Sequence, residues 1–286
     1  MRTCLNAVTT GKPRDLVSWL EVAGKYQFAG VEFSVRDLSA LVEREGSETA
    51  IHLQRRTGVA LAAFGLPVEW QSDEERFRTG MGTLPVLCQA AAAAGCTRAT
   101  TYIRPFVESD PAVVGLVAVR RLRAVCEVLG LYGIRLAIEW VGTPSMRRGK
   151  TPFLWTAEHA VTLCDAIGLP NAGLLFDSWH WFTTGADAQD LTCVPAGRIV
   201  HIHVNDAPNI PLSEQQDNVR LLPGASGVIN LVTMLGTLED RGYDGYVAVE
   251  TFSKELPLLG VDEAAARAKA AMDTVALQLA ARADAR

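Results

Sequence analysis

Short runs of β-branched and apolar residues alternate along the whole chain with longer segments in which apolar residues recur at helical spacing. This alternation predicts repeated units of one strand and one helix, and such units build parallel sheets that are covered by helices. Eight runs have the length and composition of strands. They are Thr3–Val8, Gly30–Ser34, Val59–Gly65, Ala99–Ile103, Arg135–Trp140, Gly173–Asp177, Ile199–Val204 and Tyr246–Glu250.

The segments between these runs carry apolar residues at positions i, i+3 and i+4 and are predicted to be helices. Several of them end at a glycine just before the next strand, which suits the left-handed turn that closes a helix. An Ala-rich segment, Asp262–Arg286, has the same periodicity and predicts a terminal helix. The clearest of the other helices are Asp15–Tyr26, Leu84–Ala94, Val114–Leu129, Thr156–Ile167 and Asn230–Arg241.

Eight strand–helix units in 286 residues, with no linker between them, predict a single α/β domain over residues 1–286 with the fold of a (β/α)8 TIM barrel. An open doubly wound sheet that binds a dinucleotide would carry G-x-G-x-x-G after its first strand. This chain has the lone Gly11 there. In TIM barrels the active site lies at the C-terminal ends of the strands, so those ends are the place to look for chemistry.

The charge balance limits the classes of partner. The chain has 27 Lys plus Arg against 32 Asp plus Glu, a net charge of −5, which argues against a protein that binds nucleic acid through a basic face. No apolar run approaches the roughly 20 residues that span a bilayer, and the first residues lack the pattern of a signal peptide. The six cysteines form no C-x-x-C motif. We therefore expect a cytoplasmic protein with reduced thiols, without nucleic-acid or membrane partners.

Four consecutive strands in the second half of the chain carry metal-binding side chains near their C-terminal ends: Glu139, Asp177, His203 and Glu250. A single acidic residue at a strand end is more often a helix cap or a solvated charge. Three carboxylates on neighbouring strands, however, would repel one another unless a cation lies between them. Carboxylate oxygens with one imidazole suit a single divalent ion, Mn²⁺ first, with Mg²⁺, Co²⁺ and Zn²⁺ also compatible.

Two histidines on one strand, His201 and His203, point to the same side of the predicted sheet. His203 is nearer the C-terminal end, so we predict that it is the ligand and that His201 is a core histidine one layer deeper. His180 follows Asp177 by three residues, in the turn after the strand, where it could contact a substrate oxygen beside the metal. The alternative for His180 is a surface position in a loop.

These residues and four further motifs resemble the xylose isomerase-like TIM barrels, a superfamily that includes sugar and inosose isomerases, ketose 3-epimerases and inosose dehydratases. The motifs are Asp177-Ser178-Trp179-His180, His203 with Asp206, residues 218–224 followed by Gly227-Val228-Ile229, and residues 242–245 before Glu250. The resemblance is strongest over residues 135–253. It implies that one divalent metal ion is bound by Glu139, Asp177, His203 and Glu250. It also implies that His180 contacts the substrate and that Arg220 is the arginine preceding the family's Pro-Gly motif.

Two branches of this superfamily fit the sequence poorly. Its DNA-repair endonucleases use three zinc ions and need extra histidines at the ends of the third and fourth strands, where residues 64–69 and 102–105 contain none. Its ketose epimerases carry an arginine six residues after the metal-binding histidine, where this chain has Asn209. These departures argue against a nuclease and leave the exact substrate open.

Two glutamates beside one metal ion suit proton transfer at a carbon next to a carbonyl, through an enediolate. The hypothesis is a divalent-metal-dependent sugar or inosose isomerase or epimerase, in which Glu139 and Glu250 both bind the ion and move the proton. His180 would polarise a substrate oxygen. The alternative is a lyase of the same fold, either an inosose-type dehydratase or a keto-glycoside-cleaving β-elimination enzyme, because elimination shares the first step. A metal-stabilised binding protein without turnover is a third hypothesis, which an apparent extra base disfavours.

The expected partner is a small molecule: a sugar, a cyclitol or a keto-glycoside. Besides His180 and Arg220, the predicted substrate-binding residues are Trp140, Glu69 and Lys150. Trp140 offers a ring on which a sugar could stack, and Lys150 belongs to a run of cations after the fifth strand. The alternatives are burial of the tryptophan and a solvated charged surface. The resemblance is also compatible with a homo-oligomer or a second subunit.

Overall fold

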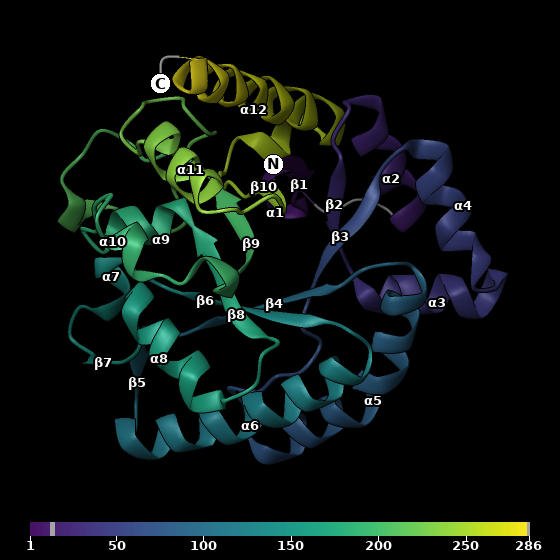
Figure 1. Ribbon diagram of the computed structural model, residues 1–286, viewed down its shortest axis with the longest axis horizontal. Helices are drawn as coiled ribbons and strands as arrows, with labels where there is room; N and C mark the ends of the chain where they lie inside the picture. The colour runs from purple at the N-terminus through teal and green to yellow at the C-terminus, as the bar shows by residue number, and fades with distance from the viewer. Residues whose placement is uncertain (12–14, 285–286) are drawn as a thin grey trace.

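The computed structural model describes residues 1–11 and 15–284, and in it eight parallel strands close into a barrel (Figure 1). Each strand pairs with the next one around the ring, and the last strand pairs with the first. The fold is therefore the predicted TIM barrel. In order around the ring, the strands are β1 (Arg2–Leu5), β2 (Gly30–Phe33), β3 (Ala60–Gly65), β4 (Arg98–Ile103), β6 (Arg135–Trp140), β8 (Ala172–Asp177), β9 (Ile199–Val204) and β10 (Tyr246–Val249).

Helices cover the outside of the barrel (Figure 1). The longer ones are α2 (Leu16–Lys25), α3 (Val35–Glu45), α4 (Glu48–Thr57), α5 (Glu74–Ala93), α6 (Pro111–Leu131), α8 (Ala157–Ile167), α11 (Leu231–Asp240) and α12 (Val261–Asp284). The shorter helices are α1 (Ala7–Thr10), α7 (Pro144–Arg147), α9 (Ser178–Thr183), α10 (Asp190–Cys193) and the 3₁₀ helices η1 (Ala196–Arg198), η2 (Leu212–Glu214) and η3 (Leu256–Leu259).

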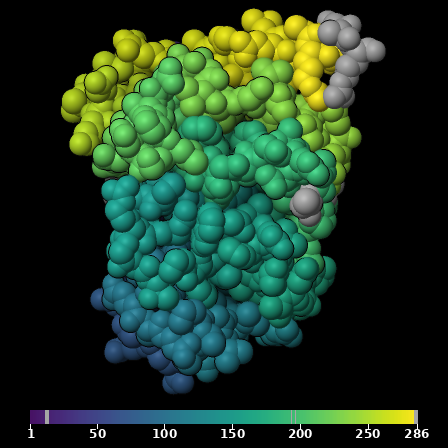
Figure 2. All heavy atoms as spheres, turned by 90° about the vertical axis from the view of Figure 1, so that its left-hand side faces the viewer, coloured from purple at the N-terminus to yellow at the C-terminus, as the bar shows by residue number. Residues whose placement is uncertain are grey.

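The two ends of the chain meet where the barrel closes. Helix α12 packs against α11 on one side and against α1 and β1 on the other. Surface colours in Figure 2 run in chain order from blue through teal and green to yellow, because consecutive units are neighbours around the barrel. This arrangement brings the C-terminal ends of all eight strands to one rim, which is where the site residues lie.

The core fills the space between the strands and the helices. Aromatic pairs contribute to it: Phe33 packs on Phe64 with ring centroids 5.9 Å apart, and Trp140 packs edge-on against Phe176 at 5.0 Å. Each such fully buried apolar side chain stabilises the fold by roughly 1.5–3 kcal/mol relative to an exposed one. Side chains of the opposite parity on the same strands face the barrel interior and are free to carry polar groups.

Several predicted strands extend too far at their C-terminal ends. The prediction of a strand over Thr3–Val8 is wrong beyond Leu5, because the Asn6 side chain accepts a hydrogen bond from the Val8 amide (2.8 Å) and begins α1. Likewise Ser34 caps α3 and does not belong to β2. Both residues are N-cap types, and such a side chain ends a strand by satisfying the free amides of the next helix.

One predicted helix begins too late. Helix α5 starts at Glu74 and not at Leu84, since Asp73 accepts a hydrogen bond from the Arg76 amide (2.9 Å) and forms the cap ten residues earlier. Pro85 lies inside this helix, where it removes one backbone hydrogen bond without ending it. The early turns are held by packing, as Gly80 lies close against the Val68 backbone.

A small sheet at the rim was not predicted. Strands β5 (Phe106–Val107) and β7 (Thr151–Pro152) pair antiparallel and tie the loop after β4 to the loop after β6. Two residues are too few to give a periodic sequence signal. The predicted run of cations, which follows β6, therefore lies in a structured loop that also contains α7.

The cysteines and the helices bear on the expectations of reduced thiols and of no membrane span. Five cysteines are buried and free of disulfides: Cys4, Cys88, Cys96, Cys126 and Cys164; the Cys193 side chain lies outside the described part. Within the described ranges, no helix combines the length and the apolar composition needed to cross a bilayer.

Candidate active site

Four adjacent strands bring the predicted ligand residues together at the rim of the barrel. Glu139 lies on β6, Asp177 ends β8, His203 lies on β9 and Glu250 directly follows β10. The register aligns Asp177 with His203, and places Glu250 two residues beyond the partner of His203 on β10. Each residue offers one ligand atom, and these atoms all lie within 4.8 Å of one another.

The orientation of His203 is defined on both sides of its ring. Its Nδ1 faces the carboxylates, 3.1 Å from Glu250 Oε2 and 3.7 Å from Glu139 Oε1. Its Nε2 lies 2.7 Å from Glu32 Oε1 on β2. Two atoms in this cluster, His203 Nδ1 and Glu139 Oε1, are buried without a hydrogen-bond partner. Buried polar atoms rarely lack partners, so a donor set of three carboxylates and one imidazole, with one unpaired atom on a carboxylate and one on the imidazole, fits a divalent cation.

Glu32 was not predicted as part of the site. Its carboxylate also lies 3.1 Å from His201 Nε2 and accepts a hydrogen bond from Asn6 Nδ2 (3.1 Å). His201 itself is fully buried and lies two residues before His203 on β9, deeper in the barrel. The sequence signal was available, because Glu32 is the one charged residue in the predicted strand Gly30–Ser34. The predicted metal ligands all came from strand ends in the second half of the chain, so Glu32 in the first half was missed.

Arg220 lies against the cluster and is fully enclosed. Its Nη1 donates to Asp177 Oδ2 (2.8 Å) and to Glu250 Oε2 (3.3 Å), and its Nη2 donates to Asp217 Oδ1 (2.9 Å). The guanidinium lies 4.6 Å from the centre of the Phe252 ring. Arg220 therefore orients two of the candidate metal ligands. Asp217 is a further site residue that the sequence analysis did not single out.

His180 lies in α9, and not in a turn, because Asp177 caps this helix by accepting a hydrogen bond from the Trp179 amide (2.6 Å). The imidazole is buried. Its Nδ1 accepts a hydrogen bond from the Gly142 amide (3.2 Å), and its Nε2 lies 3.4 Å from Arg220 Nη2. The structure thus joins His180 to the cluster through Arg220.

The site has an excess of negative charge. Five carboxylates lie in the cluster. Those of Asp177, Asp217 and Glu250 pair with the Arg220 guanidinium, whereas those of Glu32 and Glu139 lie against His201 and His203. Burial, together with the charges of Glu250 and Asp177, raises the pKa of Glu139 to about 8, although His203 opposes this shift. Charges that cannot all persist together in a buried site favour either proton uptake or a bound cation.

Other groups in the site keep or gain charge. Burial alone would raise the pKa of Asp177, but the Arg220 charge outweighs it, and the pKa lies below the ordinary value. Burial would lower the pKa of His203, yet Glu250 and Glu32 raise it well above the ordinary value. The same imidazole holds the pKa of Glu32 below its ordinary value against the effect of burial. His203 and Arg220 are therefore the groups whose positive charge offsets these carboxylates.

Three predicted substrate-binding residues lie apart from the cluster. Trp140 is fully buried, and its ring packs against Phe176 between the barrel and the helices, so it offers no face to a sugar. The Glu69 side chain is 65% exposed and pairs with Arg76 (3.4 Å). Lys150 lies over the ring of Phe106. No contact recorded among the described residues links any of the three to the four candidate ligands.

Tyr102 is a site candidate that was missed. It pairs in register with Glu139 across β4 and β6, so both side chains face the barrel interior. Its side chain is 48% exposed, which places it at the open end of the barrel. A tyrosine gives no charge signal in a sequence, and its place becomes evident only from the strand register.

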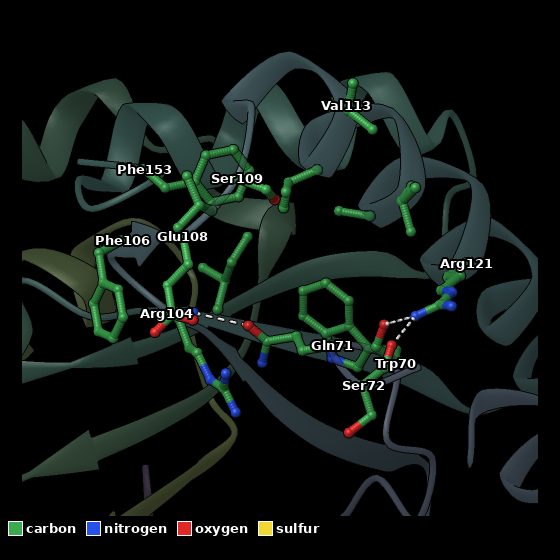
Figure 3. Close-up of a pocket in the computed structure, with 15 residues that line it drawn as sticks. Trp70, Gln71, Ser72, Arg104, Phe106, Glu108, Ser109, Val113, Arg121 and Phe153 are labelled. Atoms are coloured by element: carbon green, nitrogen blue, oxygen red, sulfur yellow. Dashed lines mark hydrogen bonds between the residues drawn. The ribbon is translucent and has the colours of Figure 1, made fainter. Parts of the chain in front are cut away.

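Two of the cavities near the rim are bounded in part by the loop after β6. One, of about 690 Å³, is bounded by Ser145, Met146 and Arg148 of the loop after β6 and by Asp217. None of the four candidate ligands lines this cavity, but Asp217, which does line it, also binds Arg220. Figure 3 shows the other, of about 360 Å³, where aromatic rings such as Phe153 gather beneath α6; none of the four candidate ligands lines it.

Comparisons with known proteins agree with the barrel fold. The sequence profile of the family described as xylose isomerase-like TIM barrel matches residues 20–276. An inosose isomerase from Halalkalibacterium halodurans is 26% identical over 274 residues, covering 94% of both chains. A solved xylose isomerase domain protein from Alicyclobacillus acidocaldarius superposes with a TM-score of 0.88 at 30% identity, over 98% of this chain and 99% of the other. The crystal structure of an IolI protein with a bound zinc atom superposes with a TM-score of 0.81 at 22% identity, over 96% and 98%.

Proposed function

The chain belongs to the xylose isomerase-like TIM barrel family, and on that basis we propose that it is a divalent-metal-dependent isomerase or epimerase of a sugar or cyclitol ketone. Isomerase or epimerase chemistry is supported at the level of the family, since the inosose isomerase relative spans nearly its whole length. One observation carries the proposal: ligand atoms from Glu139, Asp177, His203 and Glu250 converge within 4.8 Å.

The donor set favours a hard divalent ion. Three carboxylates and one imidazole suit Mn²⁺ best, and Mg²⁺, Co²⁺ and Zn²⁺ are compatible. The IolI structure contains a bound zinc atom, which supports a divalent ion in this protein as well. Bound between these side chains, such an ion would polarise a substrate carbonyl and stabilise the charge that develops when a proton leaves the adjacent carbon.

Glu139 and Glu250 are proposed to move that proton. They come from β6 and β10, with β8 and β9 between them, so they approach a substrate from two directions. One carboxylate removes the proton, and the other, or the same one, returns it to the substrate. The raised pKa of Glu139, about 8, is close to the value that favours proton transfer near neutral pH. A cation bound beside it would lower this pKa and leave the carboxylate ready to accept a proton.

The remaining residues are proposed to hold the substrate. His180 and Arg220 lie on the Asp177 side of the cluster, and Tyr102 lies beside Glu139 at the open end of the barrel. The 690 Å³ cavity next to Asp217 provides room for the part of the substrate that does not react. The Trp140 ring has no place in this proposal, since it is buried.

Exchange of carbon-bound hydrogen with solvent tests the proposal. The protein is stripped of metal, reloaded with Mn²⁺ and incubated in D₂O with a panel of inososes, keto sugars and keto-glycosides, and the products are analysed by mass spectrometry. Metal-dependent deuterium incorporation with an isomeric product is expected. An unsaturated or cleaved product would instead favour the lyase alternative. Absence of exchange with every ketone, with and without Mn²⁺, would contradict proton transfer at this site.

A further inference from the structure

The Glu32 carboxylate lies beneath the candidate metal ligands and has three nitrogen neighbours. Its Oε1 lies 2.7 Å from His203 Nε2 and 3.1 Å from His201 Nε2, and its Oε2 accepts a hydrogen bond from Asn6 Nδ2 at 3.1 Å. The side chain is only 11% exposed. A carboxylate held from three sides in this way has one orientation available to it.

This orientation decides which nitrogen of His203 faces the carboxylates. A histidine that binds a metal ion is neutral and carries one N–H, and a carboxylate beside Nε2 keeps the hydrogen on that atom. The lone pair is then on Nδ1, which lies 3.1 Å from Glu250 Oε2 and has no hydrogen-bond partner. The ring therefore presents its free lone pair to the place where the four ligand atoms meet.

We propose that Glu32 is a positioning residue for the metal centre, which fixes the tautomer and the ring orientation of His203 while His201 and Asn6 hold Glu32 itself. Carboxylates that accept a hydrogen bond from a metal-binding histidine raise its basicity, and their loss costs about 10–100-fold in metal affinity. The inference rests on the proposed function, because it needs a metal ion bound by His203.

A competing assignment uses the same carboxylate. Cys4, Glu32 and His201 also offer ligand atoms within 4.8 Å of one another, a group that could hold a second ion. Two imidazole nitrogens already share Glu32 Oε1, and an ion at that oxygen would displace one of them. The geometry therefore favours hydrogen bonding over ligation at Glu32, and the two assignments differ in the number of ions bound.

The test measures metal binding directly. Mn²⁺ is titrated by calorimetry into the metal-free wild type and into the variants Glu32→Gln, Glu32→Ala, Cys4→Ala and His201→Leu. We expect one ion per chain throughout, a loss of affinity of about 10–100-fold in both Glu32 variants, and a smaller loss in His201→Leu. Cys4→Ala, which leaves the hydrogen bonds of Glu32 in place, should retain wild-type affinity.

Nitrogen NMR separates positioning from a general structural defect. In the Zn²⁺-loaded protein labelled with ¹⁵N-histidine, wild-type His203 should have a metal-bound Nδ1 and a protonated Nε2. In Glu32→Ala the ring should lose this single, well-defined signal pattern while circular dichroism stays unchanged. If the Glu32 variants do not fold, His201→Leu decides by the same two measurements, through its weaker affinity and altered signals.

Each remaining outcome has one meaning. Wild-type affinity and unchanged His203 signals in the Glu32 variants would overturn the positioning role while leaving the metal centre in place. Two ions per chain, reduced to one by Cys4→Ala, would make Glu32 a ligand and overturn it as well. Failure of the wild type to bind Mn²⁺ or Zn²⁺ would remove the proposed function and this inference together.

Discussion

Individual residues at the rim explain why a cation would be stabilised at this site. Glu139 is forced towards its protonated form by burial and by neighbouring carboxylates, whereas Asp177 stays ionised because Arg220 donates to it at 2.8 Å. The difference between two carboxylates in one cluster follows from their contacts alone. Under the proposed function, both carboxylates would bind the ion, and Glu139, with the higher proton affinity, would also move the proton.

The first prediction concerns the two glutamates. Glu139→Gln and Glu250→Gln each retain the shape of the side chain but remove the base, so kcat should fall by about 10²–10⁴-fold. Binding of Mn²⁺ should weaken without disappearing, since three ligands remain. The rate of deuterium exchange and the Mn²⁺ affinity are measured in parallel, with the exposed Glu45→Gln as control. Full exchange activity in both variants would contradict their role as bases.

The second prediction concerns the buried imidazole of His180. Burial lowers its pKa below the ordinary value near 6.5, and Asp177 opposes this shift only in part. In the unfolded chain the ring takes up a proton as the pH falls through about 6.5, whereas the folded protein stays neutral to lower pH. The folded state then binds fewer protons, so the stability that neutral His180 contributes declines as the pH falls below about 6.5.

Urea denaturation of the metal-free protein between about pH 5 and pH 8 checks this dependence. The free energy of unfolding of the wild type minus that of His180→Gln should decrease steadily on the acid side of about pH 6.5. A difference that stays constant over the whole range would show that burial does not suppress protonation of this ring.

At the scale of elements, the position of α9 depends on the loop after β6. A Cβ atom on Gly142 would lie 2.7 Å from Thr184 Cγ2 and would collide with the backbone oxygen of His180. The loop and the helix are thus in direct contact at the residue whose amide binds His180 Nδ1. Only glycine allows this approach, and the contact fixes the helix that carries His180.

The third prediction follows from this contact. Gly142→Ala should destabilise the fold by about 1–3 kcal/mol, because the helix or the loop must move to accept a methyl group. Gly82→Ala on α5 is the matched control, since nothing lies within 4 Å of its added methyl, and it should stabilise by about 0.5–1 kcal/mol. Thermal unfolding of both variants measures the effect. Equal stabilities would contradict the close packing of α9 on the loop.

The strands could be predicted from the sequence, but where some of them end could not. The eight strands and the ligand-bearing strand ends follow from hydrophobic runs and from acidic residues at fixed places, so they could be predicted. The ends of β1 and β2 could not, because Asn6 and Ser34 continue the run in sequence but act as helix caps in space. Glu32 and Tyr102 were missed for a related reason: their importance depends on which strands become neighbours, and a list of strand ends does not contain that information.

At the scale of the whole molecule, barrel closure is what makes one site from distant segments. Glu32 on β2 contacts His203 on β9, 171 residues away, and Asn6 contacts Glu250 across the seam between β1 and β10. Such contacts exist only in the closed ring. An ion bound at the rim would therefore stabilise the barrel itself.

Two predictions at this scale are not tested by the structure: that residues 1–286 form a single domain, and that the protein is a homo-oligomer.

The fourth prediction is this linkage between metal and fold. At a free Mn²⁺ concentration 100 times the dissociation constant, binding should add about 2.7 kcal/mol to the stability of the folded state. The midpoint of thermal unfolding should rise by about 5–10 °C. Differential scanning calorimetry with and without Mn²⁺ measures it, and Asp177→Asn is the comparison variant. A midpoint that does not depend on Mn²⁺ would contradict a metal centre that joins the strands.

Anomalous diffraction from a crystal grown with Mn²⁺ tests the central claim most directly, because it locates the ion. The account predicts one anomalous peak per chain at coordination distance, about 2.0–2.3 Å, from Glu139, Asp177, His203 and Glu250, with Nδ1 as the ligand atom of His203. Absence of a peak between these side chains, or a peak elsewhere in the barrel, would contradict it.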